Sequence, residues 1–240
     1  VHFYAAENLT YNLIVAATAE EESSGPNGLN SLLKDLPNIN VAIVGEPTQM
    51  QLAIAEKGLV VFDAVVKGTA GHAAHPNNDN PILKSMDVMQ WFQNLQFDKL
   101  SDTLGPAKLT ITQINAGSQH NVVPSQVNLV LDVRVNECYT NQEIADIVSQ
   151  APCEVTPRSL RLQSSSIDKD HPLVVAGIAM GRNTYGSPTL SDQAALSCPS
   201  LKLGPGDSTR SHTADEFIYT DEIKEAVRLY IELLDQVITS

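Results

Sequence analysis

The chain has 240 residues, of which 42% are hydrophobic and 18% charged, an ordinary composition for a globular protein. Its formal net charge of -13 argues against nucleic acid or an anionic membrane as a partner, because both require a basic face. No apolar run approaches the roughly 20 residues of a membrane span. The three cysteines are odd in number and share no metal spacing, so a disulfide framework is not expected and a cytoplasmic setting is predicted.

The first predicted elements lead into an acidic triplet. Residues 1–8 are typical of a helix end, and the absence of a starting Met leads us to expect an N-terminal truncation. Residues 11–18 are predicted to form a buried strand, directly followed by Glu20-Glu21-Glu22. At about 4 Å and an effective dielectric near 20, each contact between like charges costs about 4 kcal/mol, so a divalent cation is the expected counter-charge. The alternative for the triplet alone is a solvated acidic turn.

A second carboxylate follows the next strand. We predict a helix over 29–36 and a buried strand over 41–44, which ends at Gly45-Glu46-Pro47. Strand, helix and strand in this order indicate a βαβ unit of an α/β fold with a doubly wound, mostly parallel sheet. In such sheets, sites form at the carboxyl ends of strands, where both acidic motifs lie.

From about residue 57 the pattern changes to that of an antiparallel sheet. The β-branched run 59–66 precedes an amphipathic helix over 81–95, and Asn141 is predicted to cap a second helix. Further strands are predicted at 109–114, 127–135 and 154–162. The order β-α-β-β-α-β predicts a ferredoxin-like α+β domain inserted into the α/β chain at residues 57–163.

After the insertion the first pattern returns. A helix over 171–182, a strand over 199–203 and a long amphipathic helix over 220–237 complete the α/β domain. The predicted organisation is one domain of residues 1–56 plus 164–240, interrupted by a second domain of residues 57–163.

Several short motifs follow one another along the chain. They are Thr18-Ala19-Glu20-Glu21-Glu22, Gly45-Glu46-Pro47-Thr48, Gly71-His72, Asn121-Val122-Val123-Pro124, Asp132-Val133-Arg134 and Ser211-His212. Together and in this order they resemble the family of co-catalytic metallo-deacylases that includes acetylornithine deacetylase, succinyl-diaminopimelate desuccinylase, aminoacylase and glutamate-releasing carboxypeptidase.

The resemblance implies a role for each motif residue of the α/β domain. Glu21 corresponds to the general base, and Glu22, Glu46 and His212 correspond to ligands of two divalent metal ions, Zn²⁺ or Co²⁺. Glutamate oxygen and histidine nitrogen suit such cations, and a metal-bound water ionises near neutral pH. The alternative for His212 is a hydrogen-bonded loop histidine. Ser208 has no nucleophile-elbow pattern around it, which argues against a serine hydrolase.

The resemblance also implies roles in the insertion, which it identifies as the lid and dimerisation domain of a homodimer. His72 corresponds to an oxyanion donor that reaches the active site of the other subunit, and His75 is interpreted as structural. Asn121 corresponds to a substrate contact. Arg134 corresponds to a clamp on the substrate carboxylate, and its alternative is a surface salt bridge on a strand.

The chain departs from the family pattern in one respect. It has no His-x-Asp pair and no lone bridging Asp before the glutamate triplet, so one or both metals are expected to be missing from this 240-residue piece, which we predict to be inactive. For the parent protein the resemblance implies hydrolysis of an N-acyl amino acid, with N-acetyl-L-ornithine of arginine biosynthesis as the first choice. The alternatives are a desuccinylase acting on N-succinyl-ornithine or N-succinyl-diaminopimelate, a dipeptidase, or a non-enzymatic dimerising module.

Overall fold

The computed structural model describes residues 3, 9–23 and 25–238, which form two compact units. Unit 1 comprises residues up to Glu56 and from Ser165 onward, and unit 2 comprises Lys57–Ser164. The helix end predicted at residues 1–8 lies, apart from residue 3, outside the described residues. Among the described residues, no helix is both long enough and apolar enough to cross a lipid bilayer.

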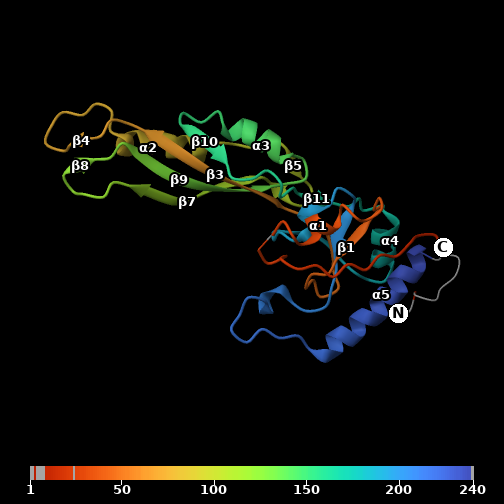
Figure 1. The fold of residues 1–240 in the computed structure, drawn as a ribbon. Coiled ribbons are helices and arrows are strands. Elements are labelled where there is room, and N and C mark those ends of the chain that lie inside the picture. Colours follow the sequence, from red (N-terminus) through yellow and green to blue (C-terminus); the bar gives the residue numbers. More distant parts are fainter. Residues whose placement is uncertain (1–2, 4–8, 24, 239–240) are drawn as a thin grey trace. The chain divides into compact units, whose positions relative to one another are not determined.

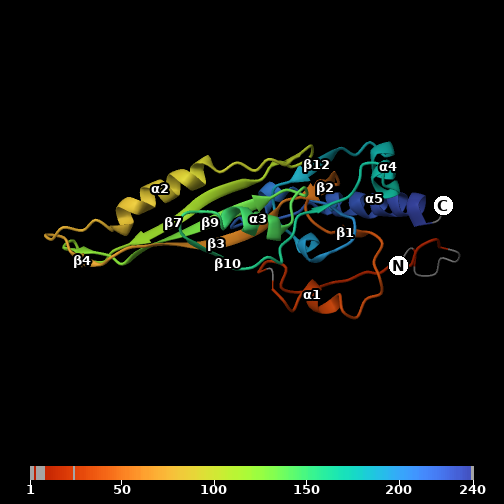
Figure 2. The same ribbon diagram turned by 90° about the horizontal axis from the view of Figure 1, so that it is seen from above.

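Unit 2 is a four-stranded antiparallel sheet with two helices packed on one face (Figures 1 and 2). The strand order is β10-β3-β9-β7, and the chain order β3-α2-β7-β9-α3-β10 makes this a ferredoxin-like arrangement. Its elements are β3 (Gly58–Lys67), β4 (Gly71–His72), α2 (Pro81–Asn94), β5 (Leu100–Ser101), β6 (Gly105–Pro106), β7 (Lys108–Ala116), β8 (Val122–Val123), β9 (Gln126–Val135), α3 (Asn141–Val148) and β10 (Glu154–Pro157).

The central strands β3 and β9 pair without interruption from Gly58 opposite Val135 to Lys67 opposite Gln126. Alternate residues of both strands are buried, as expected for a sheet with one covered face. Phe62 is fully buried there, among side chains of both helices.

The start of α3 corrects the predicted cap. Thr140, not Asn141, is the N-cap, and Thr140 and Glu143 form a capping box. Asn141 is instead a buried first-turn residue whose amide donates to the carbonyl oxygens of Leu160 and Leu162.

Unit 1 is an α/β unit built on a mixed sheet. Its elements are α1 (Leu29–Leu32), β1 (Ala42–Val44), β2 (Leu52–Glu56), β11 (Ser165–Ser166), α4 (Pro172–Ala179), β12 (Thr184–Ser187), the 3₁₀ helix η1 (Asp192–Ala195), β13 (Ser200–Lys202), the 3₁₀ helix η2 (Ser208–Arg210) and α5 (Thr220–Ile238). Strand β1 runs parallel to β13 and β12 parallel to β2, whereas β13 and β11 run antiparallel to β2. The prediction of a doubly wound, mostly parallel sheet is therefore not confirmed.

The strand predicted at residues 11–18 is also absent from this sheet. These residues have no regular secondary structure, and Val15 is 87% exposed. An apolar run becomes a buried strand only where neighbouring strands can pair with it, and within the described residues β1 pairs with β13 alone.

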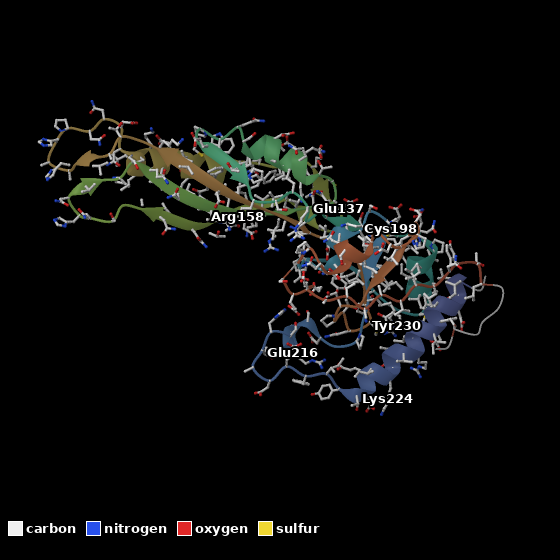
Figure 3. All side chains as sticks on the ribbon, viewed as in Figure 1. Glu137, Arg158, Cys198, Glu216, Lys224 and Tyr230 are labelled. Carbon is white, nitrogen blue, oxygen red and sulfur yellow. The ribbon has the colours of Figure 1, made fainter. Side chains whose placement is uncertain are left out.

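The core of unit 1 forms where α4 and the long C-terminal helix α5 pack on the sheet. It includes Leu52 and Leu201 from two adjacent strands and Leu229 and Leu233 from one face of α5. The Tyr230 hydroxyl donates to the carbonyl oxygen of Leu203, which ties α5 to the end of β13 (Figure 3). Burial raises the pKa of Tyr230 to about 12.

Candidate active site

The predicted metal ligand Glu46 lies where β1 ends beside β13. The ladder continues past both strands, because Leu203 N donates to Val44 O at 3.0 Å and Thr48 N donates to Gly204 O at 3.1 Å. A Cβ at Gly204 would lie 2.5 Å from Glu46 O, so only glycine allows this approach of the two backbones. The sheet thus holds Glu46 against the start of the loop that carries His212.

That loop, residues 204–219, is fixed to α5 by a charged and aromatic cluster. Arg210 forms two hydrogen bonds with Glu222, at 2.8 and 2.6 Å, and its guanidinium carbon lies 5.2 Å from the ring centroids of both Phe217 and Tyr219. Glu216, labelled in Figure 3, accepts a 2.9 Å hydrogen bond from the backbone of His212. His212 itself has a left-handed backbone, with φ of 57°.

The three glutamates of the triplet divide into two groups. Glu20 closes its own loop, since its carboxylate accepts hydrogen bonds from Asn27 N at 3.0 Å and from Asn27 Nδ2 at 3.2 Å. Glu22 instead faces His212, with Oε2 at 3.9 Å from Nε2, and both side chains are exposed. Glu21 is half-buried between them.

The electrostatics show that Glu21, Glu22, Glu46 and His212 form one cluster. Burial, Glu22 and Asp192 raise the pKa of Glu21, against the opposing effect of Lys202 and His212. Burial raises the pKa of Glu46 to about 7, with further contributions from nearby glutamates and an opposing one from Lys202. The structure therefore brings together four side chains from three widely separated places in the sequence.

The cluster fits a divalent metal in its donor chemistry but does not complete a site. Glutamate carboxylate oxygens and an imidazole nitrogen, as in the pair of Glu22 and His212, are suitable ligands for Zn²⁺ or Co²⁺. Among the described residues, however, no group of three His, Cys, Asp or Glu side chains is close enough to hold an ion.

In unit 2, the structure brings His72 and Asn121 together. His72 in β4 is opposite Val122 in β8, and the next backbone N–H, of Ala73, donates to Asn121 O at 2.9 Å. His72 Nδ1 accepts from Ala74 N at 3.1 Å, and its ring lies 5.6 Å from that of His75. His72 is exposed, which leaves its Nε2 accessible.

Arg134 is at the other end of the same sheet. It forms a two-point ion pair with Asp132 on its own strand, at 2.8 and 3.1 Å, as its alternative interpretation predicted. The distance along β9 from Gln126, near the His72 end, to Arg134 is roughly 26 Å at about 3.3 Å per residue. His72 and Arg134 of one chain therefore cannot contact the same small ligand.

Two residues beside the cluster were not predicted from the sequence as site residues. Lys202 is 2% exposed, and its positive charge opposes the rise in pKa of both Glu21 and Glu46. Asp192 accepts a 3.1 Å hydrogen bond from Thr18, just before the glutamate triplet. The only sequence signal for Lys202 is a cation between two leucines of a short strand.

The chain is similar in sequence to known proteins. Residues 54–154 match the family described as Peptidase dimerisation domain. The chain is 26% identical over 231 residues to a succinyl-diaminopimelate desuccinylase of Ehrlichia ruminantium (strain Welgevonden), covering 88% of this chain and 60% of that protein. It thus spans about 60% of the length of the curated relatives that it matches.

Two solved structures with the same fold are described as peptidases. An aminopeptidase PepT from Bacillus cereus superposes with a TM-score of 0.70 at 17% identity, over 92% of this chain and 63% of that one. A dinuclear metal-binding peptidase of the M20 family from Bacillus subtilis gives a TM-score of 0.63 at 17% identity, over 91% and 63%.

The class of protein whose fold this chain shares is that of the M20 family peptidases. Within it, the chain's resemblance to the co-catalytic metallo-deacylases that include succinyl-diaminopimelate desuccinylase is confirmed.

Proposed function

We propose that this chain forms part of a metal-dependent hydrolase that cleaves the amide bond of an N-acyl amino acid. The observation that supports this proposal is the cluster in which Glu22 lies 3.9 Å from His212, while Glu21 and Glu22 contribute to the raised pKa of Glu46. Similarity to desuccinylases and to the fold of M20 peptidases adds to it. We place the reaction in the cytoplasm, in keeping with three cysteines that are all free thiols.

In the proposed mechanism, Glu22, Glu46 and His212 would hold divalent metal, Zn²⁺ or Co²⁺, together with ligands beyond the cluster described above. Bound metal would polarise the amide carbonyl and make the attacking water more acidic. Glu21 takes a proton from that water and later gives it to the departing amine. A raised pKa suits this exchange, because it brings the proton affinity of the carboxylate closer to neutrality.

The proposed contribution of unit 2 comes from a second copy of the chain. His72 has an accessible ring nitrogen that would donate to the oxyanion, and Asn121 beside it would contact the substrate. Arg134 would bind a substrate carboxylate only by exchanging its ion pair with Asp132, and it would do so in a different site from His72 of the same chain.

Two compounds are proposed as candidate substrates. N-acetyl-L-ornithine is the first candidate from the motifs, and N-succinyl-diaminopimelate is the candidate that the named relatives favour. Both carry an acyl amide and a free amino group, and the pocket contacts that separate an acetyl from a succinyl group decide between them.

The test measures hydrolysis of both compounds by the natural protein that contains this chain, with added Zn²⁺ or Co²⁺. We expect activity that a chelator removes and a Glu21→Gln variant reduces by about 100-fold or more. Glu20→Gln is the matched control, because Glu20 is adjacent but bonds within its own loop.

Equal activity of the Glu21→Gln and wild-type proteins would exclude the proposed mechanism. A dimer without bound metal and without hydrolysis of either compound would instead favour the non-enzymatic module.

A further inference from the structure

A buried ion pair joins the two middle strands of unit 1, beside the candidate active site. Lys202 Nζ in β13 lies 2.9 Å from Glu56 Oε2 in β2, and the two side chains are 2% and 0% exposed. Burial raises the pKa of Glu56, while the ammonium of Lys202 and the hydroxyl of Ser191 oppose this change. Leucine at both positions would cost less desolvation, since a buried ion pair is often no more stable than a hydrophobic pair.

Both members of the pair also form hydrogen bonds with one segment, residues 187–195. The ammonium donates to Ser187 Oγ at 3.1 Å, to Thr189 O at 2.9 Å and to Thr189 Oγ1 at 3.1 Å. The carboxylate accepts from Ser191 Oγ at 2.8 Å and from Ser191 N at 3.4 Å. Lysine and glutamate therefore hold the same segment from two sides.

The segment continues directly to the acidic cluster. Ser191 Oγ also accepts from Gln193 N at 3.2 Å and so caps η1, whose first residue is Asp192. Asp192 accepts from Thr18 at 3.1 Å and raises the pKa of Glu21. The contacts thus lead from the ion pair through Ser191 and Asp192 to Thr18, three residues before the proposed general base Glu21.

The geometry rules out a serine–lysine nucleophile for this group. Ser187 lies at hydrogen-bond distance from Lys202, but the ammonium donates to acceptors on several sides and is paired with a carboxylate. Ser187 is only 4% exposed, so a substrate would not reach its hydroxyl.

We propose that Glu56 and Lys202 are positioning residues, which fix the segment 187–195 and hold Asp192 beside the glutamates of the active site. The catalytic meaning of this inference rests on the proposed function, whereas the positioning itself does not. The pair acts by specifying one arrangement of the segment, and its contribution to overall stability is secondary.

The test compares the double variant Glu56→Gln/Lys202→Met with the wild type by hydrogen exchange of the full chain. We expect exchange in peptides from 187–195 to become about tenfold faster, while peptides from β1 and α5 exchange at wild-type rates. The same chemical change in an exposed ion pair, Glu154→Gln/Lys67→Met, is the matched control, with both of its side chains 63% exposed. Exchange that rises equally throughout unit 1, or not at all, would overturn the inference.

A second pair of variants decides the matter if the double variant does not fold. Ser191→Ala removes the hydroxyl that links Glu56 to η1, and Ser191→Thr keeps it. We expect faster exchange in the segment for the alanine variant and rescue by threonine, and equal exchange in both would contradict the inference. In the natural protein, Ser191→Ala should lower kcat or raise KM while the metal content stays unchanged. If exchange in the segment becomes faster but no hydrolysis is found even for the wild type, the positioning stands and the proposed function fails.

Discussion

At the scale of single residues, the candidate site depends on backbone positions as much as on charged side chains. Glu46 is held where the backbone of Gly204 approaches it without a side chain between them. The chain offers a direct comparison, because Gly45 is adjacent to Glu46 but a methyl group added to it would meet only open space. Replacing each glycine by alanine therefore separates the effect of the close backbone approach at Gly204 from the general effect of losing a glycine.

We predict that Gly204→Ala destabilises unit 1 by about 1–3 kcal/mol, because the new methyl group would overlap the Glu46 carbonyl and force the two strand ends apart. Gly45→Ala should leave stability within about 0.5 kcal/mol of the wild type. Urea denaturation followed by the helix signal in circular dichroism measures both. Equal losses for the two variants would contradict the assigned role of Gly204.

At the scale of elements, long segments with clear periodicity were predictable and short ones were not. The β-branched run of β3, the alternation in β9 and the apolar spacing in α2 located the main elements of unit 2. The short strand β2 was missed, because five buried residues that end in a glutamate have no periodic signal. Residues 11–18 were predicted wrongly because hydrophobicity alone does not supply a neighbouring strand.

The same limit applies to the site. The resemblance carried by the motifs led to Glu21, Glu22, Glu46 and His212, which the fold brings together, while their chemical roles stay a prediction. Lys202 could not be predicted, because its partner Glu56 is far away in the sequence and only the antiparallel pairing of β13 with β2 joins them.

The start of α3 gives a prediction for pH. Lys99, at 2.6 Å, and the capping box at Thr140 lower the pKa of Glu143 from 4.5 to about 2. Since the folded-state pKa lies below the unfolded one, this stabilisation is complete above pH of about 4.5 and is lost as the pH falls toward about 2. Glu143→Gln should therefore reduce the stability of unit 2 at pH 6 and matter progressively less as the solution is acidified.

The single tryptophan, Trp91 in α2, reports on this unit during urea denaturation. Glu225→Gln, an exposed position on α5 in unit 1, is the control and should not change the tryptophan transition at either pH. A wild-type advantage over Glu143→Gln that stays constant between pH 6 and pH 3 would refute the assignment.

At the scale of the whole molecule, the chain consists of two units with separate cores, and unit 2 carries exposed apolar side chains at the edge of its sheet. Strand β7 is at the end of the strand order in unit 2, and Ile114 on it is 53% exposed. Leu83 and Met86 on the neighbouring helix α2 are each 62% exposed. An unpaired strand edge beside apolar side chains favours association with a second copy.

We predict that the chain forms a homodimer, which sedimentation velocity detects at micromolar concentration. The double variant Ile114→Lys/Met86→Lys should be a monomer at the same concentration. Two buried lysines per chain would have to be desolvated in the interface, which should weaken association by about 100-fold or more. Val227→Lys, at a 55% exposed apolar position on α5, should leave the dimer unchanged. A monomeric wild type, or a dimer insensitive to the double change, would exclude this surface.

The uninterrupted pairing of β3 with β9 also sets how far unit 2 can reach. The β4–β8 segment with His72 extends from one end of this ladder, so the number of paired residues fixes the distance of the imidazole from the other end. Because side chains alternate between faces, only an even change in strand length would keep the core inside, and each step of two residues would move His72 by roughly 7 Å. The length of the two strands thus sets the position of His72 within unit 2. Insertions or deletions in these strands should therefore be tolerated far less well than in the loops at either end.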